Sequence, residues 1–508
     1  MSSDLLKLKS GSDIRGTAIG PRAVLTADTV TRFAAGFALW CRQSGHPLKT
    51  AAIGRDSRLS GPTLLKAAAN GLRAMGVDVL DFGLCTTPAM FMSLLTEGFK
   101  TDASLMITAS HQPSEKNGIK FILPTGGVSA ADLDRIIACA EIVSISPELS
   151  GRLIKRDYLP AYQDILKKRI REGLDTDAEQ PLSGLHIAVD AGNGAGGFYA
   201  SMLSQLGADT TGSQFLDPDG SFPNHIPNPE DETAMASVSA ATLNSGADLG
   251  VIFDTDCDRA AIVDHEGREI NRNRLIALIS AILLKKHMGA AIVTDSVTSS
   301  GLAAFIKARG GVHHRFKRGY RNVIDEAIRL NGEGVDCPLA IETSGHAALR
   351  ENHFLDDGMY LVTVLIVEAM RLKQQGRELS DLLDDLAEPV ESVELRLDIL
   401  SGDRVATAER ALTLLSAEAE KGPDKRPAPD NREGIRVQFD LNGGRDNGWL
   451  LLRLSVHDPV MPLNIESDVK GGLLPMAQWV LSVLKDEKEI DLTSLKNYIN
   501  KQEGAQNG

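Results

Sequence analysis

The sequence predicts an α/β protein with three similar mixed α/β domains around a central cleft and a smaller α+β domain at the C-terminus. Short β-rich runs alternate with longer helical runs along most of the chain, which is typical of strands joined by crossover helices. A strand–helix–strand unit recurs three times, and the pattern changes after about Ala387. We therefore expect domains at residues 1–150, 151–270, 271–386 and 387–508.

Each repeat is predicted to begin with a strand that ends in a polar turn, at residues 51–56, 185–190 and 290–295. A helix follows, and after it a second strand that is expected to begin at Gly76, Gly207 and Gly310 in the three repeats. The third members are strands at 105–107, 249–253 and 339–341, and they lead into the turns 108–111, 254–259 and 342–346. Ligands of open α/β sheets bind at the carboxyl ends of the strands, so these three turns are expected to converge.

The C-terminal part has a different order of elements. We expect a strand at 390–399, a helix at 406–421, a polar loop at 423–431, and antiparallel strands at 435–441 and 449–456. The turn signal Asn442-Gly443-Gly444 lies between these two strands. A helix is expected at 468–485, and the tail from Gln502 is expected to fray.

Composition excludes several classes of protein. The 508 residues are 43% apolar and 24% charged, so most of the chain is expected to fold rather than remain disordered. With 54 basic and 68 acidic residues the net charge is −14, which disfavours a nucleic-acid partner, and aromatics at 5% offer no base-stacking platform. The longest apolar runs are too short to cross a membrane, so we expect no membrane partner.

Cysteine usage indicates a reducing compartment. The five cysteines are widely spaced and form no CxxC motif. Residues 1–16 have no apolar signal core and no Arg-rich transit pattern. We expect reduced thiols and a cytoplasmic protein, or one in the soluble interior of an organelle. No feature of the sequence indicates the oligomeric state.

Asp254, Asp256 and Asp258 alternate in one short run after an apolar strand. Carboxylates at this spacing can converge on one hard cation, and we interpret the run as a Mg²⁺ site rather than a solvated acidic turn. An EF-hand loop does not fit, because Arg259 stands at the place of the turn glycine and His265 at that of the bidentate Glu.

Ser110 follows another predicted strand, in a turn that contains His111 and precedes Lys120. A lone serine here is ordinarily only a turn residue. Next to a histidine and a lysine, its hydroxyl could also accept and donate a phosphoryl group, which requires a metal and cations to handle the charge.

Two weaker signals remain open. Residues 192–197 fit GxGxxG after a strand and permit a dinucleotide site, and hence a dehydrogenase, although a tight turn that only glycine fits is the favoured interpretation. Arg453 and Ser455 end a predicted strand and could hold a phosphate, although an arginine before an exposed turn is usually only solvated.

Taken together, these residues resemble the α-D-phosphohexomutases, a family of phosphoglucomutases, phosphomannomutases and phosphoglucosamine mutases. The resemblance covers nearly the whole chain in order. The phosphoserine loop at 108–120 and the metal loop at 254–259 are its most specific segments. Segments of moderate specificity lie at 11–16, 54–60, 317–320, 342–346 and 453–459.

The resemblance implies a role for each of these residues. Ser110 would be the phosphoserine, and together with Asp254, Asp256 and Asp258 it would hold Mg²⁺. Hexose 1,6-bisphosphate would be the intermediate and activator, and a mobile fourth domain would enclose the phosphosugar substrate. Arg259 would lie beside the transferred group, and Lys120 and His111 are candidates for proton transfer or electrostatic support. The implied substrate-binding residues are Arg15, Lys317, Gly319, Glu342, Ser344, His346, Arg453, Ser455 and His457.

The chain also departs from the family pattern. Gln112 replaces the usual Asn, Ile341 replaces a Gly, and His457-Asp458-Pro459 replaces Thr-Glu-Pro in the phosphate-binding loop. We expect an altered hold on the distal phosphate. A hexose 1,6-bisphosphate synthase and a phosphosugar-binding protein with weak mutase activity are therefore the alternatives to a mutase of glucose or mannose phosphates.

Overall fold

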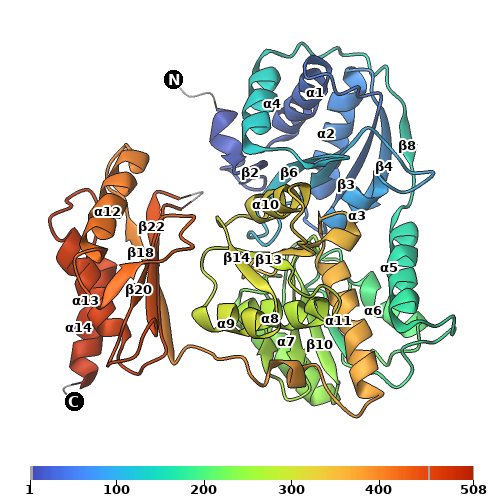
Figure 1. Cartoon of the computed structure of the whole chain (residues 1–508). Helices are drawn as coiled ribbons and strands as arrows, with labels where there is room; N and C mark the ends of the chain where they lie inside the picture. The colour runs from blue at the N-terminus through green and yellow to red at the C-terminus, as the bar shows by residue number, and fades with distance from the viewer. Residues whose placement is uncertain (1–3, 456–457, 507–508) are drawn as a thin grey trace. The chain divides into compact units, whose positions relative to one another are not determined.

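The computed structural model describes residues 4–455 and 458–506. The chain divides into two compact units, each of which is described separately (Figure 1). The first unit comprises Met1–Ile279 with Ser344–Leu382, and the second comprises Ser280–Thr343 with Leu383–Gly508.

The first unit opens with an eight-stranded sheet in the order β1-β2-β6-β5-β3-β4-β8, with β7 paired to β6. Strands β5, β3, β4 and β8 run parallel, whereas β6 is antiparallel to both β5 and β2. Helices α1, α2 and α4 pack together over the apolar core of this sheet (Figure 1). The strands are β1 (Lys9–Ser10), β2 (Asp13–Thr17), β3 (Thr50–Arg55), β4 (Asp78–Leu84), β5 (Ala103–Ile107), β6 (Lys116–Leu123), β7 (Gly126–Gly127) and β8 (Leu153–Lys155). The helices are η1 (Leu6–Leu8), α1 (Ala27–Gln43), α2 (Gly61–Ala74), α3 (Thr87–Ser93) and α4 (Ala130–Ile142).

A second sheet of the first unit has the order β12-β11-β10-β9, with β10 parallel to β9 and antiparallel to β11. All five residues of β10 are buried, as expected for a strand covered on both faces. The strands are β9 (Ile187–Asp190), β10 (Leu249–Phe253), β11 (Ala260–Asp264), β12 (Glu269–Ile270), and the paired β16 (Ala347–Leu349) and β17 (Leu355–Asp356). The helices are α5 (Leu159–Leu174), α6 (Phe198–Gln205), α7 (Glu232–Ser245), η2 (Arg350–Asn352), α11 (Gly358–Lys373) and η3 (Ser380–Leu383), the last of which ends one residue inside the second unit.

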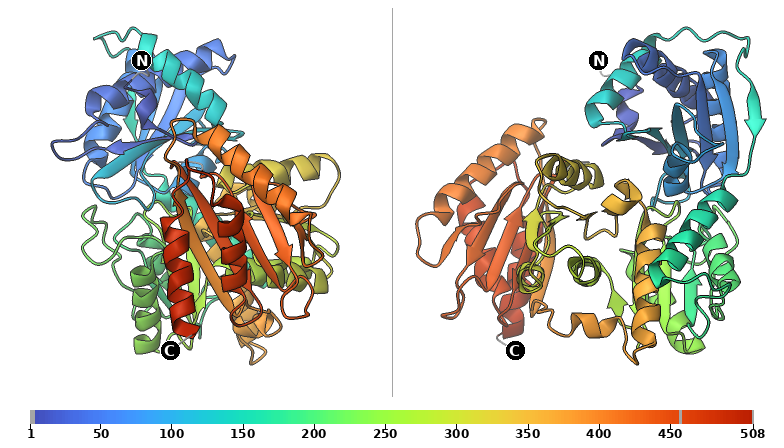
Figure 2. Two further views of the ribbon diagram at one scale, coloured as in Figure 1. Left: turned by 90° about the vertical axis from the view of Figure 1, so that its left-hand side faces the viewer. Right: turned by 45° about the vertical axis from the view of Figure 1, so that its right-hand side comes forward.

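The second unit contains a parallel set of strands in the order β14-β13-β15. It also contains a five-stranded antiparallel sheet in the order β18-β22-β21-β20-β19. Helices α12, α13 and α14 cover one face of the antiparallel sheet (Figures 1 and 2). The parallel strands are β13 (Ala291–Thr294), β14 (Val312–Arg315) and β15 (Leu339–Ile341), with helices α8 (Arg272–Leu284, which begins in the first unit), α9 (Ser300–Ala308) and α10 (Tyr320–Gly332). The C-terminal elements are β18 (Glu391–Asp398), α12 (Arg404–Ala419), β19 (Lys425–Pro427), β20 (Ile435–Phe439), β21 (Gly448–Leu452), β22 (Val460–Ser467), α13 (Leu473–Leu484) and α14 (Thr493–Gln506).

Most of the predicted elements are present, but four expectations need correction. The segment after Gly207 makes isolated bridges, between His186 and Asp209 and between Asp190 and Gln214, rather than a strand. β19 forms inside the predicted polar loop, and β22 follows at 460–467, where no strand was expected. The tail from Gln502 is not frayed as far as Gln506, because α14 continues through it. For β22 and α14, strand pairing and helix packing within the fourth domain outweigh the weak strand and helix signals of the local sequence.

Two further expectations concern the chain as a whole. Within residues 4–455 and 458–506, no helix is long and apolar enough to cross a membrane. All five cysteines are buried and free of disulfide bonds, as expected of reduced thiols.

Candidate active site

Ser110 lies in the turn between β5 and β6. Its φ of 50° is in the left-handed region, which is unusual for a residue other than glycine, and only 4% of the residue is exposed. The Ser110 amide donates a hydrogen bond to Thr108 Oγ1 (2.8 Å), which helps to hold this backbone conformation. The turn presents the hydroxyl to Asp254, whose Oδ2 accepts a hydrogen bond from Ser110 Oγ (2.8 Å).

A buried arginine fixes the shape of this turn through hydrogen bonds to its carbonyl groups. Arg58 is fully buried and donates to four carbonyl groups of the loop, those of Ser110, Gln112 (2.7 Å), Pro113 (2.8 Å) and Lys116 (3.0 Å). Its charge is paired with Asp56, 3.1 Å from Nε, and Asp56 also accepts from Thr108 Oγ1 (2.7 Å). The pair therefore connects the end of β3 to the serine loop.

Three carboxylates converge directly after β10. Asp254, Asp256 and Asp258 are fully buried, and each offers an oxygen within 4.8 Å of the others. Thr87 at the start of α3 donates through Oγ1 to Asp256 Oδ2 (2.5 Å). Among the residues that the structure describes, no hydrogen-bond partner reaches Asp256 Oδ1 or Asp258 Oδ1, although both atoms are buried. Buried carboxylate oxygens without donors fit a hard cation such as Mg²⁺.

A turn rich in glycine supports this metal loop. A Cβ on Gly194 would lie 2.8 Å from the Thr255 carbonyl oxygen, and the Ala195 amide donates to the same oxygen (2.9 Å). Gly192 has a φ of +51°. The segment 192–197 is thus a tight turn against the metal loop, which confirms the favoured interpretation.

The cluster of three acids creates strong electrostatic shifts. Burial, followed by the charges of Asp258 and Asp256, raises the pKa of Asp254 well above its usual value. Burial also acts to raise the pKa of Asp258, but the Lys120 ammonium outweighs it, and this pKa lies below its usual value. Lys120 forms ion pairs with Asp258 and with Asp256 (3.3 Å). Burial lowers the pKa of Lys120, but these two carboxylates more than offset it, so the lysine stays charged.

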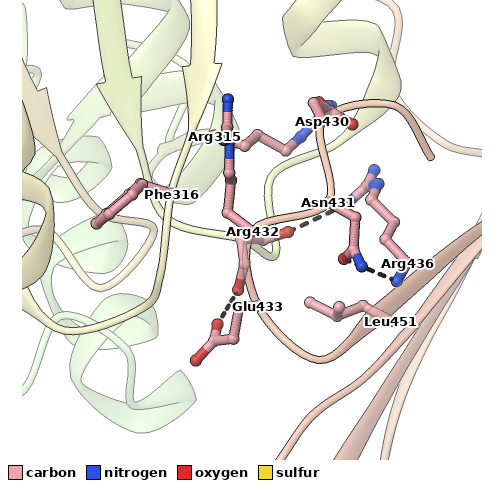
Figure 3. A pocket seen from close by; sticks show the side chains of 9 residues that line it. Arg315, Phe316, Asp430, Asn431, Arg432, Glu433, Arg436 and Leu451 are labelled. Carbon is pink, nitrogen blue, oxygen red and sulfur yellow. Dashed lines mark hydrogen bonds and ion pairs between the residues drawn. The ribbon is translucent and has the colours of Figure 1, made fainter. Parts of the chain in front are cut away.

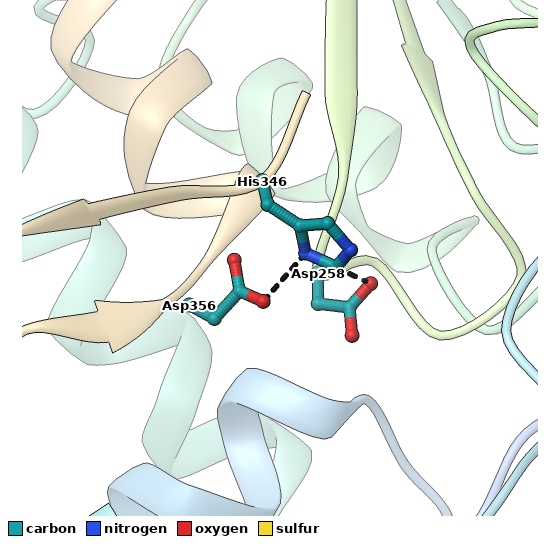
Figure 4. A group of neighbouring side chains, drawn as sticks. All are labelled: Asp258, His346 and Asp356. Atoms are coloured by element: carbon teal, nitrogen blue, oxygen red, sulfur yellow. Dashed lines mark ion pairs between the residues drawn. The ribbon is translucent and has the colours of Figure 1, made fainter. Parts of the chain in front are cut away.

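Arg259 and His346 lie together at the end of the metal loop. Arg259 Nε donates to His346 Nε2 (2.9 Å), and His346 Nδ1 lies 2.5 Å from Asp356 Oδ2 and 3.9 Å from Asp258 Oδ1 (Figure 4). Because Nε2 accepts this hydrogen bond, we place the ring proton on Nδ1, facing Asp356.

Histidine and arginine side chains also surround the serine. His111 Nδ1 lies 3.3 Å from Ser110 Oγ. The positive charge of Arg259, followed by burial, lowers the pKa of His111 to about 2, so its ring is neutral at neutral pH. Arg15 donates to the Thr108 carbonyl group and pairs with Asp13 (2.7 Å). We call Ser110, the three aspartates, Lys120 and Arg259 the aspartate cluster.

The second unit carries the other predicted site residues. The Gly319 amide donates to Glu342 Oε1 (2.6 Å), so the segment 317–320 and Glu342 lie together. Lys317 is exposed, and Ser455 is half-buried at the end of the segment after β21. Arg453 is buried, and burial lowers the pKa of its guanidinium, partly offset by Glu433. We call Lys317, Gly319, Glu342, Arg453 and Ser455 the Glu342 group.

A pocket of the second unit is lined by the segment 430–436, by Ser296 after β13, and by Arg315 and Phe316 at the end of β14 (Figure 3). Arg315 pairs with Asp430 within it, and Ser296 Oγ donates to Glu433 Oε2 (2.5 Å). Arg436 donates to the carbonyl groups of Ser296 (3.1 Å) and Thr298 (3.2 Å).

Comparisons with known proteins agree with this geometry. Sequence profiles described as "Phosphoglucomutase/phosphomannomutase, alpha/beta/alpha domain I", "domain II" and "domain III" match residues 7–142, 160–267 and 271–390. The chain belongs to the α-D-phosphohexomutase family. The resemblance noted from the sequence is thereby confirmed.

Individual phosphohexomutases match over nearly their whole length. "Phosphoglucomutase" of Neisseria gonorrhoeae is 30% identical over 468 residues, 91% of this chain and 93% of that protein. "Phosphomannomutase/phosphoglucomutase" of Pseudomonas aeruginosa PAO1 is 30% identical over 465 residues, 91% and 92% of the two chains. The crystal structure of a phosphoglucomutase/phosphomannomutase family protein from Burkholderia thailandensis has a TM-score of 0.77 at 28% identity and covers 96% and 98% of the chains. The three α/β/α domains and the multi-domain fold are therefore confirmed, whereas the exact domain boundaries stay a prediction.

The site residues predicted from the sequence fall into two sets. Ser110, His111, Lys120, Arg15, Arg259, His346 and the three aspartates meet in the first unit, and Ser344 is buried on the same segment as His346. The Glu342 group lies in the second unit. His457 lies outside the described residues.

Sequence reasoning missed the residues that hold these side chains in place. Asp56 and Arg58 belong to the 54–60 segment that carries the family resemblance, so a signal for them existed. Thr87, Asp356 and Glu433 stand in no motif that the sequence singled out, and only the fold brings them to the site.

Proposed function

We propose that this phosphohexomutase interconverts hexose 1-phosphates and hexose 6-phosphates through a phosphoserine at Ser110 and a hexose 1,6-bisphosphate intermediate. The observation that carries the proposal is the hydrogen bond from Ser110 Oγ to Asp254, inside a buried group of three aspartates flanked by Lys120 and Arg259. A serine hydroxyl beside a cation site and two fixed positive charges suits phosphoryl transfer, which depends on positioning and charge neutralisation.

In the proposed reaction the bond between Ser110 Oγ and phosphorus breaks, a bond forms between phosphorus and the free hydroxyl oxygen of a hexose monophosphate, and the proton of that hydroxyl passes to Ser110 Oγ. The bisphosphate so formed turns over and returns its other phosphoryl group to Ser110. The three aspartates and the phosphoserine would hold Mg²⁺, which when bound supplies positive charge that offsets the charge on the transferred group.

The ionisation of nearby groups supports separate roles for two side chains. Lys120 stays charged beside Asp256 and Asp258, so we assign it electrostatic support rather than proton transfer. His111 is neutral and its Nδ1 lies 3.3 Å from Ser110 Oγ, so we assign it the transfer of the proton from the sugar hydroxyl to Ser110 Oγ. A phosphoryl group on Ser110 brings negative charge beside the ring and raises its pKa, which makes it a better base.

We further assign substrate recognition to two sets of residues, each within its own unit: Arg15, Ser344 and His346 in the first, and the Glu342 group in the second. Glu342 would accept hydrogen bonds from sugar hydroxyls, and Arg453 and Ser455 would hold the phosphate that does not react. The names of the relatives favour glucose 1-phosphate as the first substrate to try and mannose 1-phosphate as the second.

Mass spectrometry of the protein after incubation with Mg²⁺ and glucose 1,6-bisphosphate tests the proposal. We expect one phosphate on the peptide that contains Ser110 and none in Ser110→Ala. No phosphate with this donor, nor with the mannose or glucosamine bisphosphates, would refute the mutase mechanism.

The replacement of Thr-Glu-Pro by His457-Asp458-Pro459 favours one alternative function, a hexose 1,6-bisphosphate synthase. A weaker hold on the distal phosphate would release the bisphosphate before it turns over and leave Ser110 without its phosphoryl group. A hexose 1,6-bisphosphate synthase would then use a separate phosphoryl donor to phosphorylate Ser110 again. Asp458 pairs with Arg396 (2.9 Å), so its carboxylate charge is balanced, and the change that bears on phosphate binding is the loss of the threonine hydroxyl. Bisphosphate that accumulates in solution faster than hexose 6-phosphate forms would favour the synthase.

A further inference from the structure

Glu433 joins the fourth domain to two loops of the third. It lies in the segment between β19 and β20, and its Oε2 accepts hydrogen bonds from Ser296 Oγ (2.5 Å) and from the Arg318 amide (3.2 Å). Ser296 follows β13, and Arg318 belongs to the segment 317–320. Figure 3 shows Glu433 among the residues that line the pocket, which also include Ser296.

At each end, the contacts of Glu433 lead to a member of the Glu342 group, Arg453 at one end and Glu342 at the other. Gly434, next to Glu433, has a φ of +57°, and a Cβ there would lie 2.1 Å from the Leu452 carbonyl oxygen and 2.8 Å from Arg453 Cα. Only glycine lets the segment lie so close to Arg453. At the other end, the Gly319 amide donates to Glu342 Oε1. A continuous set of contacts therefore runs from Arg453 through Glu433 to Glu342.

The segment that carries Glu433 is firmly attached to the third domain. Asp430 pairs with buried Arg315, which also donates to the Ser299 carbonyl group (2.8 Å). Buried Arg436 donates to the carbonyl groups of Ser296 and Thr298, and its guanidinium lies 3.5 Å from the centre of the Trp449 ring. With both flanks anchored, the Glu433 carboxylate has a fixed position from which to orient other groups.

We propose that Glu433 is a positioning residue that couples the phosphate-binding segment of the fourth domain to the sugar-binding loop of the third. The proposal rests on the proposed function. The distal phosphate and the sugar hydroxyls are then recognised by one pre-aligned set of groups, which lowers the entropic cost of ordering them on binding. The bisphosphate must release both sets of contacts together before it turns over.

Hydrogen–deuterium exchange on the free protein tests the coupling without any substrate. Glu433→Ala removes the acceptor, and we expect exchange at the Arg318 and Gly319 amides to rise about tenfold. Glu433→Gln keeps an oxygen that can accept both hydrogen bonds, and it should restore most of the protection. Arg432→Gln, a change at an exposed neighbour on the same segment, is the matched control and should leave both amides unchanged. Unchanged protection in Glu433→Ala would overturn the proposal.

Calorimetry in the Ser110→Ala background tests the consequence for binding, with glucose 1-phosphate and inorganic phosphate as ligands. We expect Glu433→Ala to weaken glucose 1-phosphate binding about tenfold and inorganic phosphate binding less than twofold, because only the sugar phosphate uses both ends of the network. Equal losses for the two ligands indicate general damage to the domain and would overturn the coupling. If the Ser110→Ala protein binds neither glucose nor mannose phosphates, the proposed function fails instead, and the exchange experiment still reports on the coupling.

Discussion

The aspartate cluster and the Glu342 group hold their side chains by different means. In the aspartate cluster, fully buried acids are paired with nearly buried cations, as in Asp258 with Lys120, and the buried pair of Asp56 with Arg58 supports the serine loop beside it in the same way. In the Glu342 group, the Glu342 carboxylate accepts from a backbone amide of a loop, as neighbouring Glu433 does, and Lys317 is exposed. Buried charge pairs tolerate few substitutions, because removing one partner leaves the other as an uncompensated buried charge. Hydrogen bonds from loop amides carry no such penalty, so we expect substitutions in the Glu342 group to cost less stability than substitutions in the buried charge pairs.

The largest effect should come from the serine itself. Ser110→Ala removes the oxygen that carries the phosphoryl group, and we expect mutase turnover to fall by at least about 10³-fold. Ser114→Ala, in the same loop, should stay within about twofold of the wild type, since Ser114 has no part in the proposed chemistry. A coupled assay of glucose 6-phosphate formation measures both. If Ser110→Ala retained a tenth of the activity, another residue would have to carry the phosphoryl group.

Arg58 tests how strongly buried charge pairing holds the first unit. Arg58→Met leaves Asp56 buried without its cation, and we expect a loss of about 3–5 kcal/mol in the free energy of unfolding. The double variant Arg58→Met/Asp56→Asn should recover at least half of this loss. At exposed Lys317 in the Glu342 group, the same change to Met should cost less than about 0.5 kcal/mol. Urea unfolding compares the three proteins, and similar losses at Arg58 and Lys317 would remove the contrast between the two groups.

Thr87 tests whether the carboxylates are oriented for a metal. Thr87→Val keeps the shape but removes the hydroxyl that donates to Asp256 Oδ2, so this ligand loses its orientation. We expect the Mg²⁺ concentration for half-maximal activity to rise about 10- to 100-fold. The control is Thr233→Val, the same change at an exposed position of α7. If the Mg²⁺ requirement did not shift in Thr87→Val, the hydrogen bond from Thr87 would not be what orients Asp256 for the metal.

These predictions depend unequally on the sequence. The sequence indicated the aspartate cluster through two short motifs, the alternating acids 254–258 and Ser110 with His111. Each motif follows an apolar strand, and such patterns can be recognised from neighbouring residues alone. Most of the second unit's contacts were not predictable, since Glu433 lies in a polar loop and meets Ser296 across 137 positions of the chain. β22 was missed because Pro462 and Asn464 interrupt its apolar pattern, and it is defined by pairing on both sides with β18 and β21.

The smallest effect concerns pH and the sheet of the fourth domain. Burial raises the pKa of Glu466 to about 7, against the opposing charge of Arg436 and a hydrogen bond from Trp449 Nε1 (2.9 Å). A carboxyl group whose pKa is higher in the folded state binds its proton more tightly there than in the unfolded chain. Its contribution to stability is therefore full below about pH 4.5 and is lost as the pH rises through about 7.

Glu466→Gln is neutral at every pH and should lack this dependence. Because Glu466 is partly exposed, we expect the wild type to lose only about 1–2 kcal/mol more than Glu466→Gln between pH 5 and pH 8. Unfolding followed by tryptophan fluorescence measures the difference, with Glu409→Gln, at an exposed position of α12, as the control. Parallel pH profiles for the wild type and Glu466→Gln would mean that Arg436 keeps the carboxylate charged. Buried ion pairing would then govern the second unit as it does the aspartate cluster.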